Sequence, residues 1–270
     1  MKSPVIALLA SIFAFVLQPP SPQQSSIQSK QAIPAQQNEL QQRPDTDDDW
    51  QIQNWLNDGP GAIERLVGLG VDSETAKGFV DSFEENDLHI QWHSVRSDST
   101  ALSAMLFLPC NGMGGANLFA LKKGTEGWRT TDRVGFDCHY DDTVSMEIAR
   151  IHDPNRDEVL IHHACQEHGT GFVQQNYNVF SVAQGKLKLR LDTVEVLDDH
   201  QPPERIHDIV RRSTFVVIPI LNSRSRAIEE TRSSTLNDHL TVQRRIFRWE
   251  PKKARYESSG FTPVAAVPAS

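Results

Sequence analysis

The residues whose types and spacing could do chemistry are concentrated between positions 151 and 165, in the stretch IHDPNRDEVLIHHAC. Asp153, Asn155 and Asp157 place carboxylate and amide oxygens at every second position, and oxygen is the ligand atom that calcium prefers. Asp-Pro and Asn are also turn formers, and the segment joins two short apolar runs. The pattern leaves a calcium site and a hairpin turn open, and it favours the turn.

Nitrogen and sulfur ligands follow directly, and they raise the question of zinc. The candidates are His162, His163, Cys165 and His168, with His139 as a further one. Successive side chains of a strand point to opposite faces, so His162 and His163 cannot both reach one ion without distortion. We expect one of them to be buried and hydrogen-bonded and the other to face a groove. Zinc is therefore a weaker candidate than calcium, and a protein without any cofactor is favoured over both.

Complete catalytic signatures are missing from the chain. HGTGF lacks the Gly-x-Ser-x-Gly elbow, and NGMGGAN lacks the Lys-Ser/Thr pair of a phosphate loop. An unfamiliar hydrolase site would need His139, Asp141, His163 and His168 to converge within hydrogen-bond reach. The sequence favours a non-catalytic protein and keeps the hydrolase as an alternative.

Three cysteines occur in the chain: Cys110, Cys138 and Cys165. An odd number in an exported protein is most simply one disulfide and one free thiol. Pairing of Cys138 with Cys110 and pairing of Cys138 with Cys165 both stay open. No local signature of a catalytic thiol surrounds any of the three.

Aromatic and histidine side chains near the expected strand ends could line a binding surface, because such surfaces are rich in aromatic residues. They are Trp92, Trp128, Tyr140, His168, Phe172 and Tyr177. A core or rim position is the alternative for each of them, and it is favoured. The expected ligand is a protein or a glycan of unknown identity, and self-association is a further expectation.

Charge and the N-terminal segment narrow the class of protein. A net charge of −8 without a run of Lys or Arg argues against nucleic acid as a partner. Residues 1–18 combine a lysine with a short apolar run, which predicts a signal peptide or an uncleaved N-terminal anchor. The protein is thus expected to be exported, periplasmic or extracellular, with membrane contact only through that segment.

Composition divides the rest of the chain. Residues 19–49 are rich in Gln, Pro and Ser and predict a disordered linker, and residues 259–270 predict a flexible tail. Residues 50–87 have helical periodicity and predict a helical hairpin, whose second helix starts at Asp72 or Ser73. Its apolar face is expected to pack on the domain that follows.

Residues 88–258 read as β-structure with an internal repeat. Asp98, Asp153 and Asp208 are spaced by 55 residues, and the apolar run 105–110 aligns without gaps with 160–165 and 215–220. Each unit is expected to be a four-stranded meander, with bounds near 88–142, 143–197 and 198–258. In the second unit Leu187, Leu189 and Leu191 alternate with basic residues and are expected to share one face.

Units of this size resemble propeller blades, and a β-trefoil or β-prism is the alternative. Asp153-x-Asn155-x-Asp157 before a strand is similar to the acidic loops of exported propellers of the FG-GAP and VCBS type. That resemblance implies calcium at the loop. The match departs from the family at Pro154 and at Glu158, where a glycine would allow the sharp turn. The sequence as a whole predicts a mainly β binding or scaffold module with N-terminal helices; a metal-stabilised module is an alternative.

Overall fold

The computed structural model describes residues 48–81, 89–98, 101–110, 115–137, 144–167, 172–199, 209–236 and 239–264. Of these, 164–167, 172, 199, 209 and 236 are described by their backbone alone. The expected signal peptide, residues 19–47 of the expected linker and residues 265–270 of the expected tail lie outside these ranges.

Three short helices open the described chain: α2 (Asp49–Asn57), α3 (Ala62–Gly68) and α4 (Ser73–Val80). The expected two-helix hairpin is thus wrong in number, because Gly59 and Gly61, both at positive φ, separate α2 from α3. Asp72 is the N-cap of α4, and its carboxylate accepts a hydrogen bond from Thr75 N at 2.8 Å. None of the described helices is long and apolar enough to cross a membrane.

Thirteen strands in the described ranges follow the helices and form two antiparallel sheets. The first sheet has the order β1-β2-β3-β4, from β1 (Gln91–Val95), β2 (Ser103–Leu108), β3 (Ala116–Gly124) and β4 (Gly127–Phe136). The second has nine strands, with the path β12-β11-β10-β9-β8-β7-β6-β5 and β13 paired to β11. Its strands are β5 (Val144–Ala149), β6 (Glu158–Glu167), β7 (Phe172–Ala183), β8 (Lys186–Asp199), β9 (Ile209–Pro219), β10 (Arg226–Leu236), β11 (His239–Glu250), β12 (Arg255–Ser258) and β13 (Thr262–Pro263).

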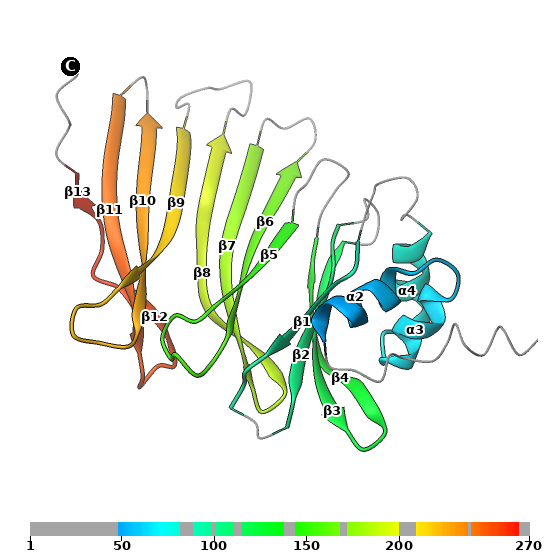
Figure 1. Cartoon of the computed structure of the whole chain (residues 1–270). Helices are drawn as coiled ribbons and strands as arrows, with labels where there is room; N and C mark the ends of the chain where they lie inside the picture. The colour runs from blue at the N-terminus through cyan, green and yellow to red at the C-terminus, as the bar shows by residue number, and fades with distance from the viewer. Residues whose placement is uncertain are drawn as a thin grey trace, which may run out of the picture.

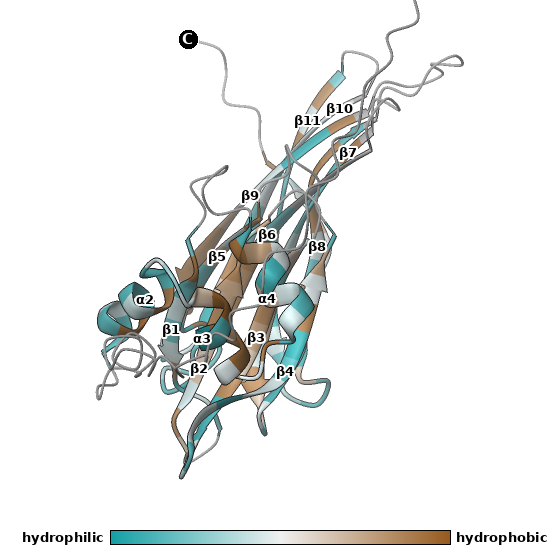
Figure 2. Ribbon diagram, turned by 90° about the vertical axis from the view of Figure 1, so that its right-hand side faces the viewer, coloured by the Kyte–Doolittle hydropathy of each residue, from teal (hydrophilic) through white to brown (hydrophobic). Residues whose placement is uncertain are grey.

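The elements pack as successive layers, which Figure 1 shows side by side from the helices to β11. The helices cover one face of the first sheet, where Leu56 and Phe79 meet Trp92 and Trp128. The expected packing of the helices on the following domain is confirmed. Figure 2 shows apolar residues concentrated on the strands behind the helices. A second core joins the other face of the first sheet to β5–β8, and a third joins β5–β8 to β9–β12.

The nine-stranded sheet bends between β8 and β9. Only four residue pairs join these two strands, from Val196 to Asp199 on β8. Beyond that seam, β9–β12 lie against the face of β5–β8: the ring of Phe215 stacks on Tyr177 with centroids 4.1 Å apart. Two half-sheets therefore face each other, and their charged residues are enclosed between them.

The expected mainly β architecture with N-terminal helices is confirmed, whereas its arrangement as propeller blades is not found. The described strands form no closed or propeller sheet, and they form layers in place of a trefoil or prism. The physical reason lies in β5–β8, which is apolar on both faces: Ile161 and Phe180 face the first sheet, and Leu160 and Val179 face β9–β12. A sheet with two apolar faces needs a layer on each side.

The first two predicted units share their strand register. Leu118 pairs with Phe107 and Val134 in the first unit. Residues 177, 162 and 193, which occupy the corresponding places in the second, pair in the same way. The alignment fails for the third copy: residues 215–220 begin in β9, the first described strand of that unit, whereas 105–110 and 160–165 begin in second strands. Apolar composition alone aligned β9, because any buried strand has it.

Bulges disturb the alternation predicted for 187–191. Val179 pairs with Leu191 while Phe180 pairs with Leu189, which leaves Arg190 without a partner on β7. Leu187 therefore faces the second core and Leu191 the third, while Leu189 is 49% exposed. The expectation that the three leucines share a face is wrong for this reason. A bulge at Thr131 occupies the same place on β4, the fifth residue of the strand.

Candidate functional site

The acidic loop is a turn closed by its own side chains. Asp153 Oδ1 accepts a hydrogen bond from Asn155 N at 2.8 Å, and the other oxygen of Asp153 is 3.3 Å from Arg156 Nε. Asp157, 8% exposed, accepts from Arg96 N and Arg150 Nε, both at 2.8 Å. The oxygens thus serve different partners, and the structure does not bring them together as a ligand set.

The two histidines of β6 lie on opposite sides, as the alternation predicts. His162 Nδ1 is 2.8 Å from Glu195 Oε2, in the space toward β9–β12. His163 contacts the carbonyl oxygen of Asp137 and the ring of Phe136, on the side of the first sheet. Among the described side chains, no three of His, Cys, Asp or Glu gather around a metal position. His139, Asp141 and His168 of the hydrolase alternative lie outside the described residues.

Half of the proposed surface aromatics are core residues. Trp92 and Trp128 are 1% exposed and pack edge to face, with centroids 5.2 Å apart. Tyr177 is 2% exposed and packs against His162 and Phe215. Tyr140 and His168 lie outside the described residues, and Phe172 is described by its backbone only. The core alternative therefore applies to all three aromatics whose side chains are described.

Cys110 packs at the border of the second core and is disulfide-bonded. Cys138 lies outside the described residues, and Cys165 is described by its backbone, opposite Gln174. The choice between the two pairings that the sequence leaves open stays a prediction.

Polar groups buried between β5–β8 and β9–β12 tie these two layers together. Glu158, fully buried, accepts a hydrogen bond from Tyr256 Oη at 2.6 Å and from His152 N at 3.2 Å. The ring of His152 stacks on Trp249 at 4.0 Å. Burial and the nearby Glu158 carboxylate raise the pKa of Tyr256 far above its ordinary value. The phenol is thus a fixed hydrogen-bond donor, which makes this a structural contact.

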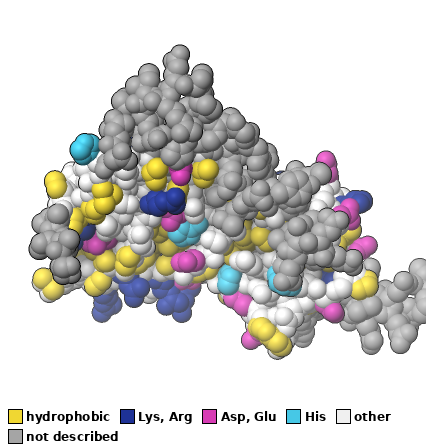
Figure 3. Space-filling model, turned by 90° about the horizontal axis from the view of Figure 1, so that it is seen from above, with side chains coloured by type: hydrophobic (Ala, Val, Ile, Leu, Met, Phe, Trp, Pro, Cys, Tyr) yellow, Lys and Arg dark blue, Asp and Glu magenta, His cyan; other side chains and the backbone are white. Residues whose placement is uncertain are grey.

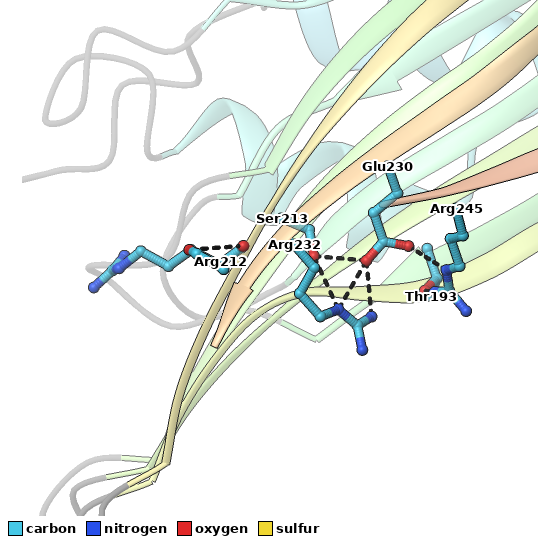
Figure 4. A network of polar contacts seen from close by, with 7 residues as sticks. Thr193, Arg212, Ser213, Glu230, Arg232 and Arg245 are labelled. Carbon is cyan, nitrogen blue, oxygen red and sulfur yellow. Dashed lines mark hydrogen bonds and ion pairs between the residues drawn. The ribbon is translucent and has the colours of Figure 1, made fainter. Parts of the chain in front are cut away.

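A second tie surrounds Glu230, which is also fully buried (Figure 4). Its Oε1 accepts from Ser213 Oγ at 2.7 Å and Arg232 Nε at 2.9 Å. Its Oε2 accepts from Arg245 Nε at 2.5 Å, and Arg245 also donates to Thr193 Oγ1 at 2.7 Å. Arg245 therefore connects β11 to β8 across the interface. Two guanidinium groups neutralise one carboxylate here, and both are themselves mostly buried.

Strand β8 supplies charged residues to this interface through its bulges. Arg190, the first bulged residue, donates to Ser181 Oγ at 2.7 Å and to Ala254 O at 2.8 Å, beside the ring of Trp249. Glu195, the second, has no partner on β7 and meets His162. Burial lowers the pKa of Arg190, while its bond to Glu195 raises the pKa of His162. Bulges commonly re-aim side chains in this way.

Two openings in the described surface could take a ligand. A groove of 540 Å³ lies between β8 and the β11–β12 turn and is lined by paired or exposed polar groups such as Asp192, Arg255 and Glu257. A pocket of 320 Å³ lies between the helices and the β3–β4 turn, lined by Trp55, Glu64, Arg65, Gly68, Leu69, Glu126, Gly127, Trp128 and Arg129. The surface seen from above carries apolar, acidic and basic side chains side by side (Figure 3).

The pocket is the better candidate site because aromatic and charged groups converge on it. Trp55 is half-buried, and the guanidinium of Arg65 lies 5.8 Å from its ring centroid. Arg65 is held in place, since it donates to Asp58 O at 2.6 Å. Arg129 is exposed at the rim and donates to Gly68 O. Such an arrangement suits binding, because no nucleophile lines the pocket.

Sequence reasoning named Trp128 but missed Trp55 and Arg65, and it missed Glu158 and Glu230. Trp55 had a signal, since it stands in an amphipathic helix next to a Gly-Pro-Gly break. The two glutamates stand inside apolar strands, and a lone acid in such a place is a sign of a buried partner. Comparison with protein-family models, with curated proteins and with solved structures finds no match for this chain.

Proposed function

We propose that the chain is an exported, non-catalytic binding module and that its ligand site is the pocket between α2–α3 and the β3–β4 turn. The observation that carries the proposal is the aromatic and charged lining of this pocket, with Trp55 and Arg129 at its accessible side. Its volume of 320 Å³ lies at the lower end of the range for ligand sites. That size suits a short segment of a protein or glycan, the partner classes that the sequence favours.

The ionisable groups of the interior support a non-catalytic role. Glu158, Glu230 and His162 each hold a partner from another strand, so that they are engaged in joining layers. A catalytic acid or base has to reach a substrate, and a fully buried, fully paired carboxylate does not. The export part of the proposal rests on the sequence of residues 1–18 alone.

The test is binding to a peptide library and a glycan array, with three proteins compared. Trp55→Ala and Arg129→Ala are expected to abolish the signals that the wild type gives. Trp50→Ala is the matched control, because Trp50 lies on the same helix but is 71% exposed and outside the pocket. Binding that survives Trp55→Ala, or an absence of any binding by the wild type, would contradict the proposed site.

Melting temperatures separate this proposal from the metal-stabilised alternative. The turn at 153–157 is already closed by Arg150, Arg156 and backbone N–H groups. We therefore expect the same melting temperature with calcium, with zinc and with EDTA. A shift of several degrees with one metal would favour the alternative.

A further inference from the structure

Helix α2 covers the free edge of β1 with a row of polar side chains. They are spaced four residues apart: Asp49, Gln53 and Asn57. Asp49 accepts a hydrogen bond from Ser94 N at 2.9 Å, and Gln53 Oε1 accepts one from Trp92 N at 3.2 Å. Asn57 Oδ1 accepts one from Ile90 N at 2.7 Å. The backbone donors on the outer edge of β1 are thus taken one after another by a helix.

The spacing works because the two periods nearly coincide. Four residues of an α-helix rise about 6 Å, and two residues of a strand rise about 6.6 Å. Donors that point to one edge of a strand recur every second residue, and β1 presents them at 90, 92 and 94. An antiparallel row of acceptors at 57, 53 and 49 therefore stays in register over the whole strand.

Asn57 reproduces the hydrogen bonds of a neighbouring strand residue most closely. Its Nδ2 donates to Ile90 O at 2.8 Å, while its Oδ1 accepts from Ile90 N. A side-chain amide has the same donor and acceptor as a peptide group, so Ile90 makes both bonds of an antiparallel pair. What the edge recognises is consequently the chemistry of an extended backbone.

Strand β1 itself fits this edge. Its residues, QWHSV, include no Asp, Glu, Lys or Arg, so two copies side by side would place no like charges opposite each other. With a two-fold axis at Trp92, Ile90 of one chain lies opposite Ser94 of the second copy. Every outward donor would then meet an acceptor. Edge strands without charges are the ones that pair with other chains.

We propose that the edge of β1 is a strand-acceptor site which α2 keeps closed, and that its partner, when α2 is displaced, is β1 of a second copy. The two first sheets would join through an antiparallel β1–β1 seam into one eight-stranded sheet. The contacts of Asp49, Gln53 and Asn57 are the bonds that this exchange replaces. The site is independent of the pocket and of the ligand proposed above.

The experiment removes the side-chain acceptors but keeps the apolar face of the helix. The triple variant Asp49→Ala, Gln53→Ala, Asn57→Ala is made in the full chain, with Ile52 and Leu56 left in the core. Asn54→Ala, an exposed change on the same helix, is the matched control. Circular dichroism checks that both fold, and sedimentation velocity at several concentrations gives the mass.

A second variant identifies the surface used. Ser94→Pro, added to the triple variant, removes one outward N–H from β1, and proline is tolerated on an edge strand. We expect the wild type and Asn54→Ala to be monomers, the triple variant to double in mass, and the quadruple variant to return to a monomer. A triple variant that stays monomeric overturns the proposal. Doubling that persists with Ser94→Pro overturns it as well, because association then uses another surface.

Discussion

At the scale of single residues, three carboxylates inside the molecule decide how the outer layers hold together. Glu158, Glu195 and Glu230 each face a partner on a different strand: Tyr256, His162 and the pair Arg232 and Arg245. Removing charges from water is costly, and the cost is offset only where geometry and hydrogen bonds are good. Each acid is therefore expected to be sensitive to loss of its own charge or of its partner.

Glu230→Ala is expected to lower the free energy of unfolding by about 3 kcal/mol, because it leaves two mostly buried guanidinium groups without their carboxylate. Urea unfolding followed by fluorescence measures the change. Glu229→Ala is the matched control on the same strand, since Glu229 meets only the half-exposed Arg244 at 3.5 Å. A change within about 0.5 kcal/mol is expected there. Equal effects of both substitutions would contradict the role given to Glu230.

The His162–Glu195 contact predicts a dependence of stability on pH. The bond to Glu195 raises the pKa of His162 above its ordinary value of 6.5. A raised folded-state pKa contributes stability that is complete below the unfolded-state pKa and is lost as pH rises through the folded-state value. Between about pH 6.5 and pH 9, urea midpoints of the wild type should therefore fall.

Glu195→Gln should flatten that part of the curve, because the histidine no longer gains a charged partner. An NMR titration of the His162 ring should show the pKa of this group moving down in the variant. If the slope is the same in both proteins, other groups cause it and the contact does not control stability in this range.

At the scale of elements, strand β8 shows how a local irregularity re-aims a strand. The bulge at Arg190 rotates the residues after it, so that Leu187 and Leu191 serve different cores. The same bulge turns Arg190 into the interface with β9–β12, where Ser181 and Ala254 accept its hydrogen bonds. A charged residue at a bulge can therefore belong to a core that simple alternation assigns to its neighbours.

Arg190→Ala is expected to lower the free energy of unfolding by about 1–2 kcal/mol, through the loss of two hydrogen bonds and the contact with Trp249. Near-ultraviolet circular dichroism should change as well, because Trp249 loses a neighbour. Lys188→Ala, two residues earlier and exposed, should change neither within about 0.5 kcal/mol. A loss as large for Lys188 would show that β8 responds to any substitution.

At the scale of the whole molecule, the stack of layers has an unequal pair of ends. Helices cover the outer face of the first sheet, whereas β9–β12 form the last layer of the described chain and expose Val216 to 52%. The last layer is joined to β8 by four residue pairs, so side-chain contacts such as Glu158 with Tyr256 carry much of the attachment. We expect it to open before the rest of the molecule does.

Hydrogen exchange measures this order of opening. Tyr256→Phe removes one donor to a buried carboxylate and should cost about 1.5–3 kcal/mol. Amide protection in β10–β12 should fall by more than protection in β2 and β3, which lie in the two cores nearer the helices. A uniform fall over all strands would show that the layers unfold together.

Local chemistry determined part of this molecule. Alternation along β6 separates His162 from His163, and Asp72 starts α4, because each outcome depends on the few residues around it. The mainly β architecture with N-terminal helices follows in the same way from periods and turn residues. The register shared by the first two units is also visible in the spacing of 55 residues between β2 and β6.

Contacts between distant residues decided the rest. Alternation gives no sign of the bulge at Arg190, because its partners Ser181 and Ala254 lie up to 64 residues away. The burial of Glu158 depends on Tyr256, 98 residues later, and the cover of β1 depends on matching α2 to it across more than 30 residues. The sequence by itself determined the kind and order of the elements, since propensity and period are local. Only the tertiary structure decided that the sheets stack as layers and which charges they enclose, because burial and pairing energies arise between segments that the chain keeps far apart.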